Sequence, residues 1–269
     1  MKRLHAIAGL PRSGSTALGA ILSQNPAFYV SPTSLLCHTI DTIRKGYSGS
    51  PEFKAMLARG EGEARLEKAI RAFVRGWYPM PKVIFDKGRG WGHNALVLKK
   101  LFPSSKIILC VRDLRAIFGN IEKHEAKSPL LTTATTPVEQ TQYDRADKMF
   151  SSQGLVGMPL NGIEDALRKR HSHVYICQYE PFVEDPEKTI HDIYGFLGEK
   201  KFKHDFKNIP EETEDSGVYD ALLLNKFPHK VRKEVKKPDV NEWKKFISKD
   251  IADLISRRYE GYQKTFGFF

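Results

Sequence analysis

The sequence contains no apolar run of 18 residues and only three cysteines among 269 residues. A transmembrane helix needs about 20 consecutive apolar residues, so we expect no membrane span. A sparse and odd set of cysteines is typical of a reducing compartment, and we expect a cytoplasmic protein. No His-x-x-His or Cys-x-x-Cys cluster has the spacing of metal ligands, so no metal is expected.

Internal repeats, low-complexity tracts and sharp breaks in composition are also absent, which favours a single domain over residues 1–269. Hydrophobic residues make up 41% of the chain and charged residues 28%, as in globular proteins with a sizeable core. The N-terminus, Met1-Lys2-Arg3 and a short apolar stretch, lacks the long apolar region of a signal peptide. We interpret that stretch as a first strand.

The net charge is +11 and the isoelectric point is near 9.4. Such a charge indicates an anionic partner, which is a nucleic acid, a membrane surface or a multiply charged small molecule. A solvated basic surface that serves solubility is the alternative. Charge alone does not choose among these.

Apolar, β-branched runs separated by helix-length segments are typical of a parallel sheet that is covered on both faces. The fold class predicted is α/β, a P-loop-like three-layer sandwich with a central parallel sheet and a helical C-terminal extension. Strands are predicted at 4–8, 83–85, 107–111 and 174–177, helices at 15–24, 64–77, 94–102, 114–123, 186–197 and 251–266, and loops at 127–137 and 199–217.

A glycine-bounded turn, residues 9–16, joins the first predicted strand to a helix that opens on hydroxyl residues. Backbone N–H groups in such a turn and the positive end of the helix hold oxyanions together. The loop matches the Walker A motif, Gly-x4-Gly-Lys-Ser/Thr, at Gly9, Gly14 and Thr16. Ser15 stands at the position of the Walker lysine, and the cation of this loop is Arg12. An enzyme that uses ATP needs that lysine and a magnesium site, so a terminal group other than a γ-phosphate is indicated. A purely structural strand-to-helix turn is the alternative.

At this loop the chain resembles the sulfotransferases that use 3′-phosphoadenosine-5′-phosphosulfate, especially the tyrosylprotein sulfotransferases, which carry Pro-Arg-Ser-Gly-Thr/Ser-Thr. The segment Leu22-Ser-Gln-Asn-Pro26 fits the same family. The resemblance implies that Arg12 neutralises the group being transferred. It also implies that the 5′-phosphosulfate is bound by Ser13, Gly14, Ser15 and Thr16.

The predicted strand 107–111 runs into Arg112-Asp113-Leu114-Arg115. An arginine at the carboxyl end of a strand lies where open α/β sheets bind ligands. An arginine there is also often exposed or paired with a neighbour such as Asp113. The family's second motif is Val-Arg-Asp-x-Arg with a serine eight residues after the first arginine. The resemblance therefore implies that Arg112 binds the 3′-phosphate, and Asn120 replaces the serine.

Two further segments extend the predicted cofactor site. The segment 179–186 is similar to the family's Tyr-Glu-x-Leu-Val-x-x-Pro, and the following helix ends in Phe-Leu-Gly as in the family. This similarity implies that Tyr179 approaches the nucleotide. The basic segment 226–237 is either a solvated run or a flap over the nucleotide, and Lys230 is the predicted cofactor ligand in it.

The segment 85–91 leaves its predicted strand with an acid, two cations and an aromatic residue. Because a lysine in this place assists the loop cation in related sulfotransferases, Lys87 is a catalytic residue by resemblance. Tyrosylprotein sulfotransferases carry a glutamate base shortly after the position of Asn25-Pro26, whereas this chain has Ser31-Pro-Thr33-Ser34. Asp86 ranks first as the catalytic base, and the competing residues are His38, Asp41 and His93.

These motifs predict an enzyme, a sulfotransferase that moves a sulfuryl group from 3′-phosphoadenosine-5′-phosphosulfate to an acceptor hydroxyl or amine by in-line transfer. One alternative is a P-loop small-molecule kinase, which needs a magnesium carboxylate and a cation for the γ-phosphate. The other is a basic module that binds polyanions or nucleic acid, with binding that weakens steeply in salt. We expect no nucleic acid partner. The motifs predict the donor and leave the acceptor and the oligomeric state open.

Overall fold

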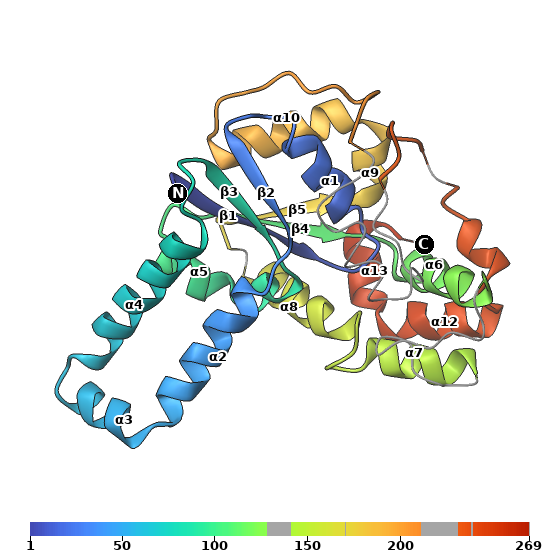
Figure 1. Ribbon diagram of the computed structural model, residues 1–269. Coiled ribbons are helices and arrows are strands. Elements are labelled where there is room, and N and C mark those ends of the chain that lie inside the picture. The colour runs from blue at the N-terminus through green and yellow to red at the C-terminus, as the bar shows by residue number, and fades with distance from the viewer. Residues whose placement is uncertain (128–140, 170, 211–230, 238, 269) are drawn as a thin grey trace.

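The centre of the molecule is a five-stranded parallel sheet in the order β2-β3-β1-β4-β5. The computed structural model describes residues 1–127, 141–169, 171–210, 231–237 and 239–268. The strands are β1 (Arg3–Gly9), β2 (Phe28–Thr33), β3 (Val83–Lys87), β4 (Ile107–Val111) and β5 (Val174–Gln178). The predicted parallel sheet is therefore confirmed, and Figure 1 shows it between layers of helices.

The three central strands are buried on both faces except at Arg3, which is why their sequences are mostly apolar; His5, Asp86 and Lys87 are their buried polar residues. β1 lies between β3 and β4, with Ile7 opposite Lys87 on one side and Gly9 opposite Cys110 on the other. The four strands predicted from sequence correspond to β1, β3, β4 and β5. Because β1 is central, the loop that follows it is flanked by the carboxyl ends of β3 and β4.

β2 was not predicted, because its sequence Phe-Tyr-Val-Ser-Pro-Thr places a proline inside the strand. The strand forms at the edge of the sheet, and its register with β3 shifts between Val30 and Thr33, around Pro32. An edge position and an irregular register are the conditions under which a strand tolerates proline.

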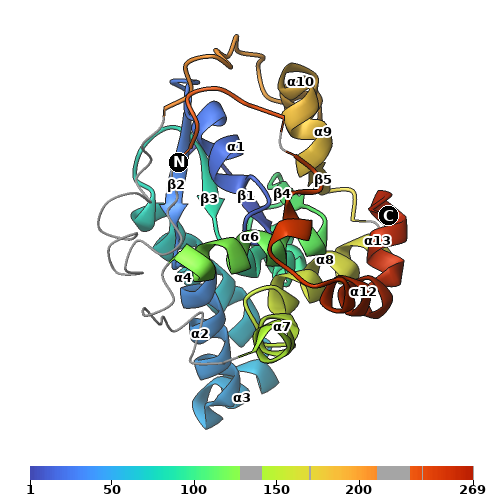
Figure 2. The ribbon, with the colours of Figure 1, turned by 90° about the vertical axis from the view of Figure 1, so that its right-hand side faces the viewer.

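Two sets of helices cover the two faces of the sheet (Figure 1 and Figure 2), and each set has its own apolar cluster. One face carries α1 (Ser15–Leu22), α9 (Tyr179–Glu184) and α10 (Pro186–Leu197). The other face carries α2 (Leu36–Gly49), α4 (Gly62–Trp77), η1 (Arg89–Gly92), α5 (Ala95–Leu101), α6 (Leu114–Lys127), α7 (Gln142–Phe150), α8 (Gly157–Lys169), α12 (Lys249–Arg258) and α13 (Glu260–Phe266). In Figure 1, α2, α3 (Pro51–Ala58) and α4 project from the sheet as an arm.

The helices predicted from sequence are all present, with one change at the C-terminus. The predicted helix 251–266 is two helices, α12 and α13, which meet at Tyr259. This turn lets Ile251 and Ile255 of the first helix and Tyr262 of the second pack on one cluster.

Helices α2 and α8 were not predicted, because their sequences contain glycine and proline. α2 ends in Gly46-Tyr-Ser-Gly49, and α8 contains Pro159 and Gly162. Gly162 is needed where α8 meets η1, because a Cβ atom there would lie 2.9 Å from the backbone nitrogen of His93. Tertiary packing overrides propensity at this contact.

Residues 199–210 contain no helix or strand, as predicted, and most of the predicted loop 127–137 falls outside the described residues. Within the described residues, no helix has both the length and the apolar character needed to cross a membrane.

Candidate active site

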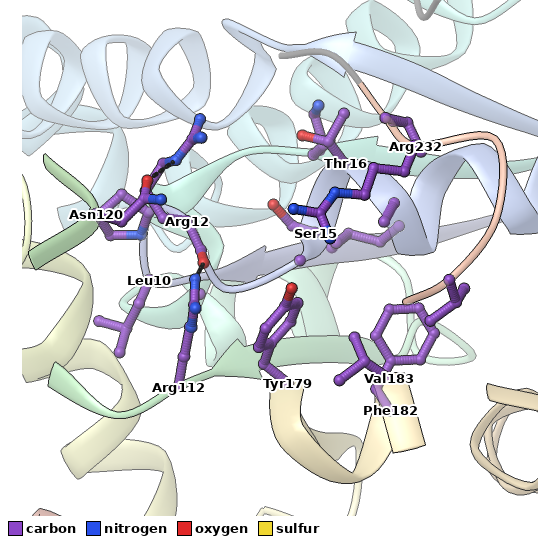
Figure 3. Close-up of a pocket in the computed structure, with 18 of the residues that line it drawn as sticks. Leu10, Arg12, Ser15, Thr16, Arg112, Asn120, Tyr179, Phe182, Val183 and Arg232 are labelled. Atoms are coloured by element: carbon purple, nitrogen blue, oxygen red, sulfur yellow. Dashed lines mark hydrogen bonds between the residues drawn. The ribbon is translucent and has the colours of Figure 1, made fainter. Parts of the chain in front are cut away.

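A cavity of about 340 Å³ opens at the carboxyl edge of the sheet. It is bounded by the loop after β1, the ends of β3 and β4, helices α6 and α9, and the C-terminal segment 231–236 (Figure 3). The carboxyl edge of an open parallel sheet is where ligands of α/β proteins bind. All but one of the residues predicted to bind the cofactor or the transferring group and described by the structure line it, namely Arg12, Gly14, Ser15, Thr16, Lys87, Arg112, Asn120 and Tyr179.

The loop between β1 and α1 takes its shape from two glycines with positive φ. Gly9 has φ 126°, and a Cβ atom there would lie 2.1 Å from the carbonyl oxygen of Cys110. Gly14 has φ 87°, and its Cβ atom would lie 2.7 Å from the ring of Tyr179. Only glycine fits these positions, because one approaches a strand and the other an aromatic ring.

The N-terminus of α1 faces the cavity through Ser15 and Thr16. No side chain caps this helix end, since Gly14 occupies the cap position. The first-turn N–H groups of a helix carry partial positive charge and need acceptors. Ser13, whose role in binding the 5′-phosphosulfate stays a prediction, has a buried hydroxyl that donates to the carbonyl oxygen of Leu10 at 2.6 Å. Ser13 therefore closes the turn from within.

Arg12 extends from the loop toward α6. Its Nε donates to Oδ1 of Asn120 at 2.7 Å, and its Nη2 lies 3.4 Å from Nε2 of His124. Burial and the neighbouring Arg12 guanidinium lower the pKa of His124 to about 4. His124 is therefore neutral near pH 7 and accepts a hydrogen bond without adding a second positive charge. Arg12 also has φ 59°, the only positive φ of a non-glycine residue among those described.

Arg112 is held between the loop and an aromatic ring. Its Nη1 donates to the carbonyl oxygen of Arg12 at 2.8 Å, and its guanidinium lies 4.3 Å from the ring centroid of Tyr179. The alternative pairing with Asp113 is not found, because Asp113 forms a bidentate ion pair with Arg115. The Nε of Arg112 is buried and has no hydrogen-bond acceptor among the described residues. This N–H group is available to an anionic ligand.

Lys87 and Asp86 point to opposite faces of β3, as successive residues of a strand do. Lys87 is 8% exposed and lines the cavity. Asp86 is fully buried and accepts hydrogen bonds from the hydroxyl of Tyr78 at 2.5 Å and from Nε1 of Trp91 at 2.6 Å. Burial raises the pKa of Asp86, against the effect of these donors. Asp86 does not line the cavity, so its position disfavours the predicted role as the base.

The other base candidates lie on the arm side of the sheet. Asp41 is paired with Arg44 and accepts from Asn94, and Nε2 of His93 lies 2.6 Å from the carbonyl oxygen of Met158. His38 is exposed on α2. None of the three lines the cavity. The described residues also contain no cluster of His, Cys, Asp and Glu side chains that could hold a metal ion.

The C-terminal segment supplies a cation that sequence reasoning missed. Lys230, the predicted ligand, lies outside the described residues, whereas Arg232 lines the cavity and reaches toward Ser15 in Figure 3. The basic run 226–237 was the available signal, but sequence alone did not determine which residue turns inward. The same end of the cavity has an apolar wall, which was also not predicted, formed by Phe182, Val183, Ile209, Val231 and Val235.

Comparison with known proteins assigns this architecture to a family. A family model described as sulfotransferase family matches residues 6–203. Protein-tyrosine sulfotransferase 2 of Gallus gallus is 28% identical over 203 residues, which cover 71% of this chain and 50% of that protein. The chain thus spans about half the length of this curated relative.

Solved structures share the fold at low sequence identity. The sulfotransferase domain from the curacin biosynthetic pathway has a TM-score of 0.60 and 15% identity, covering 97% of this chain and 98% of that domain. The sulfotransferase domain of the Synechococcus PCC 7002 olefin synthase has a TM-score of 0.57 and 18% identity, covering 97% and 96%. Retinol dehydratase, solved with androsterone and the inactive cofactor PAP, has a TM-score of 0.52 and 15% identity, covering 97% and 80%. The family match over most of the sequence and the shared fold agree, and the chain belongs to the sulfotransferase family.

Proposed function

We propose that this chain transfers a sulfuryl group from 3′-phosphoadenosine-5′-phosphosulfate to an acceptor hydroxyl or amine. The observation that carries the proposal is the anion-binding loop, which lacks a Walker lysine and lies between Lys87 of β3 and Arg112 after β4. Lys87 at the end of β3 and Arg112 after β4 lie on opposite sides of β1, and cations at two places along one edge of the sheet suit a nucleotide with phosphates on two ribose positions. Membership in the sulfotransferase family supports the same donor.

We assign each part of the donor to one part of the cavity wall. The N-terminus of α1, with Ser15 and Thr16, suits the 5′-phosphosulfate, and Arg232 adds positive charge opposite it. Arg112 and Asn120 suit the 3′-phosphate, because Nε of Arg112 has no acceptor among the described residues. The apolar wall beside Phe182 suits the faces of the adenine ring.

In the proposed reaction the acceptor atom attacks the sulfur atom in line with the departing phosphate oxygen. The bond from sulfur to that oxygen breaks, adenosine 3′,5′-bisphosphate leaves, and the acceptor's proton passes to a base or to water. Negative charge grows on the phosphate oxygen that leaves. Arg12 and Lys87 both line the cavity, and we assign this stabilisation to them because preorganised charges in a cavity act most strongly where charge develops.

Asp86 supports this arrangement from the opposite face of β3. Its carboxylate binds Tyr78 and Trp91, and these bonds fix the strand end so that Lys87 faces the cavity. We expect Asp86→Asn to lower the free energy of unfolding by about 1–3 kcal/mol, because the new amide places N–H groups against a donor. Urea denaturation measures this change.

The same variant separates a structural Asp86 from a catalytic one. Turnover per folded molecule is expected to fall far less than the roughly hundredfold or larger loss that follows removal of a general base. A hundredfold loss of turnover with an unchanged free energy of unfolding would instead support Asp86 as the base.

Binding of the donor's product tests the proposed function without knowledge of the acceptor. Adenosine 3′,5′-bisphosphate at about a hundred times its Kd is expected to raise the melting temperature by roughly 5–10 °C. ATP with magnesium is expected to give a smaller shift, because the loop lacks the Walker lysine. Differential scanning fluorimetry measures both. A larger shift with ATP and magnesium would favour the kinase alternative, and indifference to the bisphosphate would refute the proposal.

We also propose that the chain forms a single domain and that the protein is cytoplasmic. One sheet with helices on both faces supports a single domain over residues 1–269. Three free, buried cysteines, Cys37, Cys110 and Cys177, support a reducing, cytoplasmic location.

A further inference from the structure

The main chain of Arg112 lies beyond the last rung of the sheet. The pairing of β4 with β5 ends at Val111 and Gln178, so Arg112 has no strand partner for its N–H and carbonyl groups. Tyr262 of α13 satisfies both. Its hydroxyl donates to the carbonyl oxygen of Arg112 at 3.0 Å and accepts from the backbone nitrogen of Arg112 at 3.3 Å.

Tyr262 is suited to a fixed role because its surroundings allow it little freedom. The side chain is 4% exposed, and its ring packs 4.9 Å from Phe266 and 6.1 Å from Phe268 between centroids. Burial raises the pKa of the Tyr262 hydroxyl well above its usual value, so the group stays protonated and keeps its donor.

The neighbouring residue of α13 holds the next position of the chain. Nε2 of Gln263 donates to Oδ1 of Asp113 at 3.2 Å, and the same carboxylate binds the guanidinium of Arg115. The far end of α13 is tied to the sheet through Gln178, whose Nε2 donates to the carbonyl oxygen of Phe266 at 3.0 Å. α13 is thereby bonded to the main chain of Arg112, to Asp113 after it, and to Gln178 at the end of the neighbouring strand.

We propose that Tyr262 is a positioning residue for the 3′-phosphate site, and that α13 fixes the main chain from which the Arg112 side chain extends. The inference rests on the proposed function, in which Arg112 binds the 3′-phosphate. The guanidinium must meet the ligand, the carbonyl oxygen of Arg12 and the ring of Tyr179 at once. These three contacts can form together only if the Cα atom of Arg112 stays in place. Loss of the Tyr262 hydroxyl frees that main chain, and we expect the contact with the 3′-phosphate to weaken first.

The test compares two nucleotides that differ only in the 3′-phosphate. Calorimetric titration of the full chain gives the Kd of adenosine 3′,5′-bisphosphate and of adenosine 5′-phosphate, and their ratio reports recognition of the 3′-phosphate. Tyr262→Phe is expected to weaken binding of the bisphosphate by about fivefold to tenfold, the value of one hydrogen bond or slightly more. Binding of the monophosphate is expected to stay within about twofold.

Tyr259→Phe is the matched control. Tyr259 lies three residues earlier, and its hydroxyl donates to the carbonyl oxygen of Phe150 at 3.1 Å, away from Arg112. Its removal is expected to leave the ratio unchanged. Gln263→Met is a second variant, which removes the bond to Asp113 and is expected to weaken binding of the bisphosphate relative to the monophosphate by about twofold to fivefold.

Each outcome decides between the two proposals. If the wild-type chain binds both nucleotides equally, the proposed function fails and this inference fails with it. If the wild-type chain prefers the bisphosphate but Tyr262→Phe and Gln263→Met keep the preference, or lose affinity for both nucleotides equally, only the positioning role is overturned.

Discussion

Arg12→Ala is expected to lower kcat by about 10²- to 10³-fold, the usual loss when one preorganised donor to a developing charge is removed. Arg12 is the cation of the loop that precedes α1, and its guanidinium lines the cavity on the side of Asn120 and His124. Truncation also removes the hydrogen bond to Asn120. The loop is expected to keep its shape, because the positive φ angles of Gly9 and Gly14 do not depend on this side chain.

Formation of adenosine 3′,5′-bisphosphate from the donor measures this loss, with a screened acceptor or with water as a slow acceptor. Arg12→Lys keeps the charge but loses the planar fork that reaches both Asn120 and His124, so an intermediate rate is expected. Arg71→Ala removes an arginine that pairs with Glu67 on α4 and is the control for the loss of a positive charge. Retention of more than about a tenth of the turnover by Arg12→Ala would contradict its assignment.

Arg112→Ala is expected to weaken binding of adenosine 3′,5′-bisphosphate by about 10- to 150-fold, the equivalent of roughly 1.5–3 kcal/mol for hydrogen bonds to a charged group. The side chain brings a buried N–H group with no acceptor among the described residues, so the ligand gains the contact without breaking another. The substitution also removes the cation from the face of Tyr179.

Calorimetry with the bisphosphate and with adenosine 5′-phosphate separates the 3′-phosphate contact from general damage to the cavity. The monophosphate is expected to lose much less affinity. Arg112→Lys keeps a point charge without the stacked guanidinium plane and is expected to recover only part of the binding. An equal loss of affinity for the two nucleotides would contradict the assignment of Arg112 as the ligand of the 3′-phosphate.

The anion loop was predictable from the sequence because its conformation depends on local residues. Gly9 and Gly14 stand where backbone contacts and positive φ require glycine, and the spacing of the motif alone marks both positions. The strand ends that carry Lys87 and Arg112 were also predictable, since each follows a short apolar run. Local patterns therefore indicate the donor side of the cavity.

The rest depends on packing between distant segments. β2 contains Pro32 and forms only because it lies at an edge with an irregular register. Arg232 enters the cavity from a segment more than 100 residues beyond Arg12, Lys87 and Arg112. The position of Asp86 outside the cavity was open to prediction, since the alternation of a strand places Asp86 and Lys87 on opposite faces. Its partners, Tyr78 and Trp91, were not predictable, because they come from a helix end and a turn.

The left-handed backbone of Arg12 has a consequence for attempts to make this protein more robust. A non-glycine residue in that conformation costs about 1–2 kcal/mol, and the loop bears this cost at the residue proposed to carry the chemistry. A screen that selects only for thermal resistance will favour glycine at this position, as it favours relief of local strain elsewhere. Variants recovered in that way are expected to fold better and to be catalytically silent, so any such screen of this chain has to select for turnover as well.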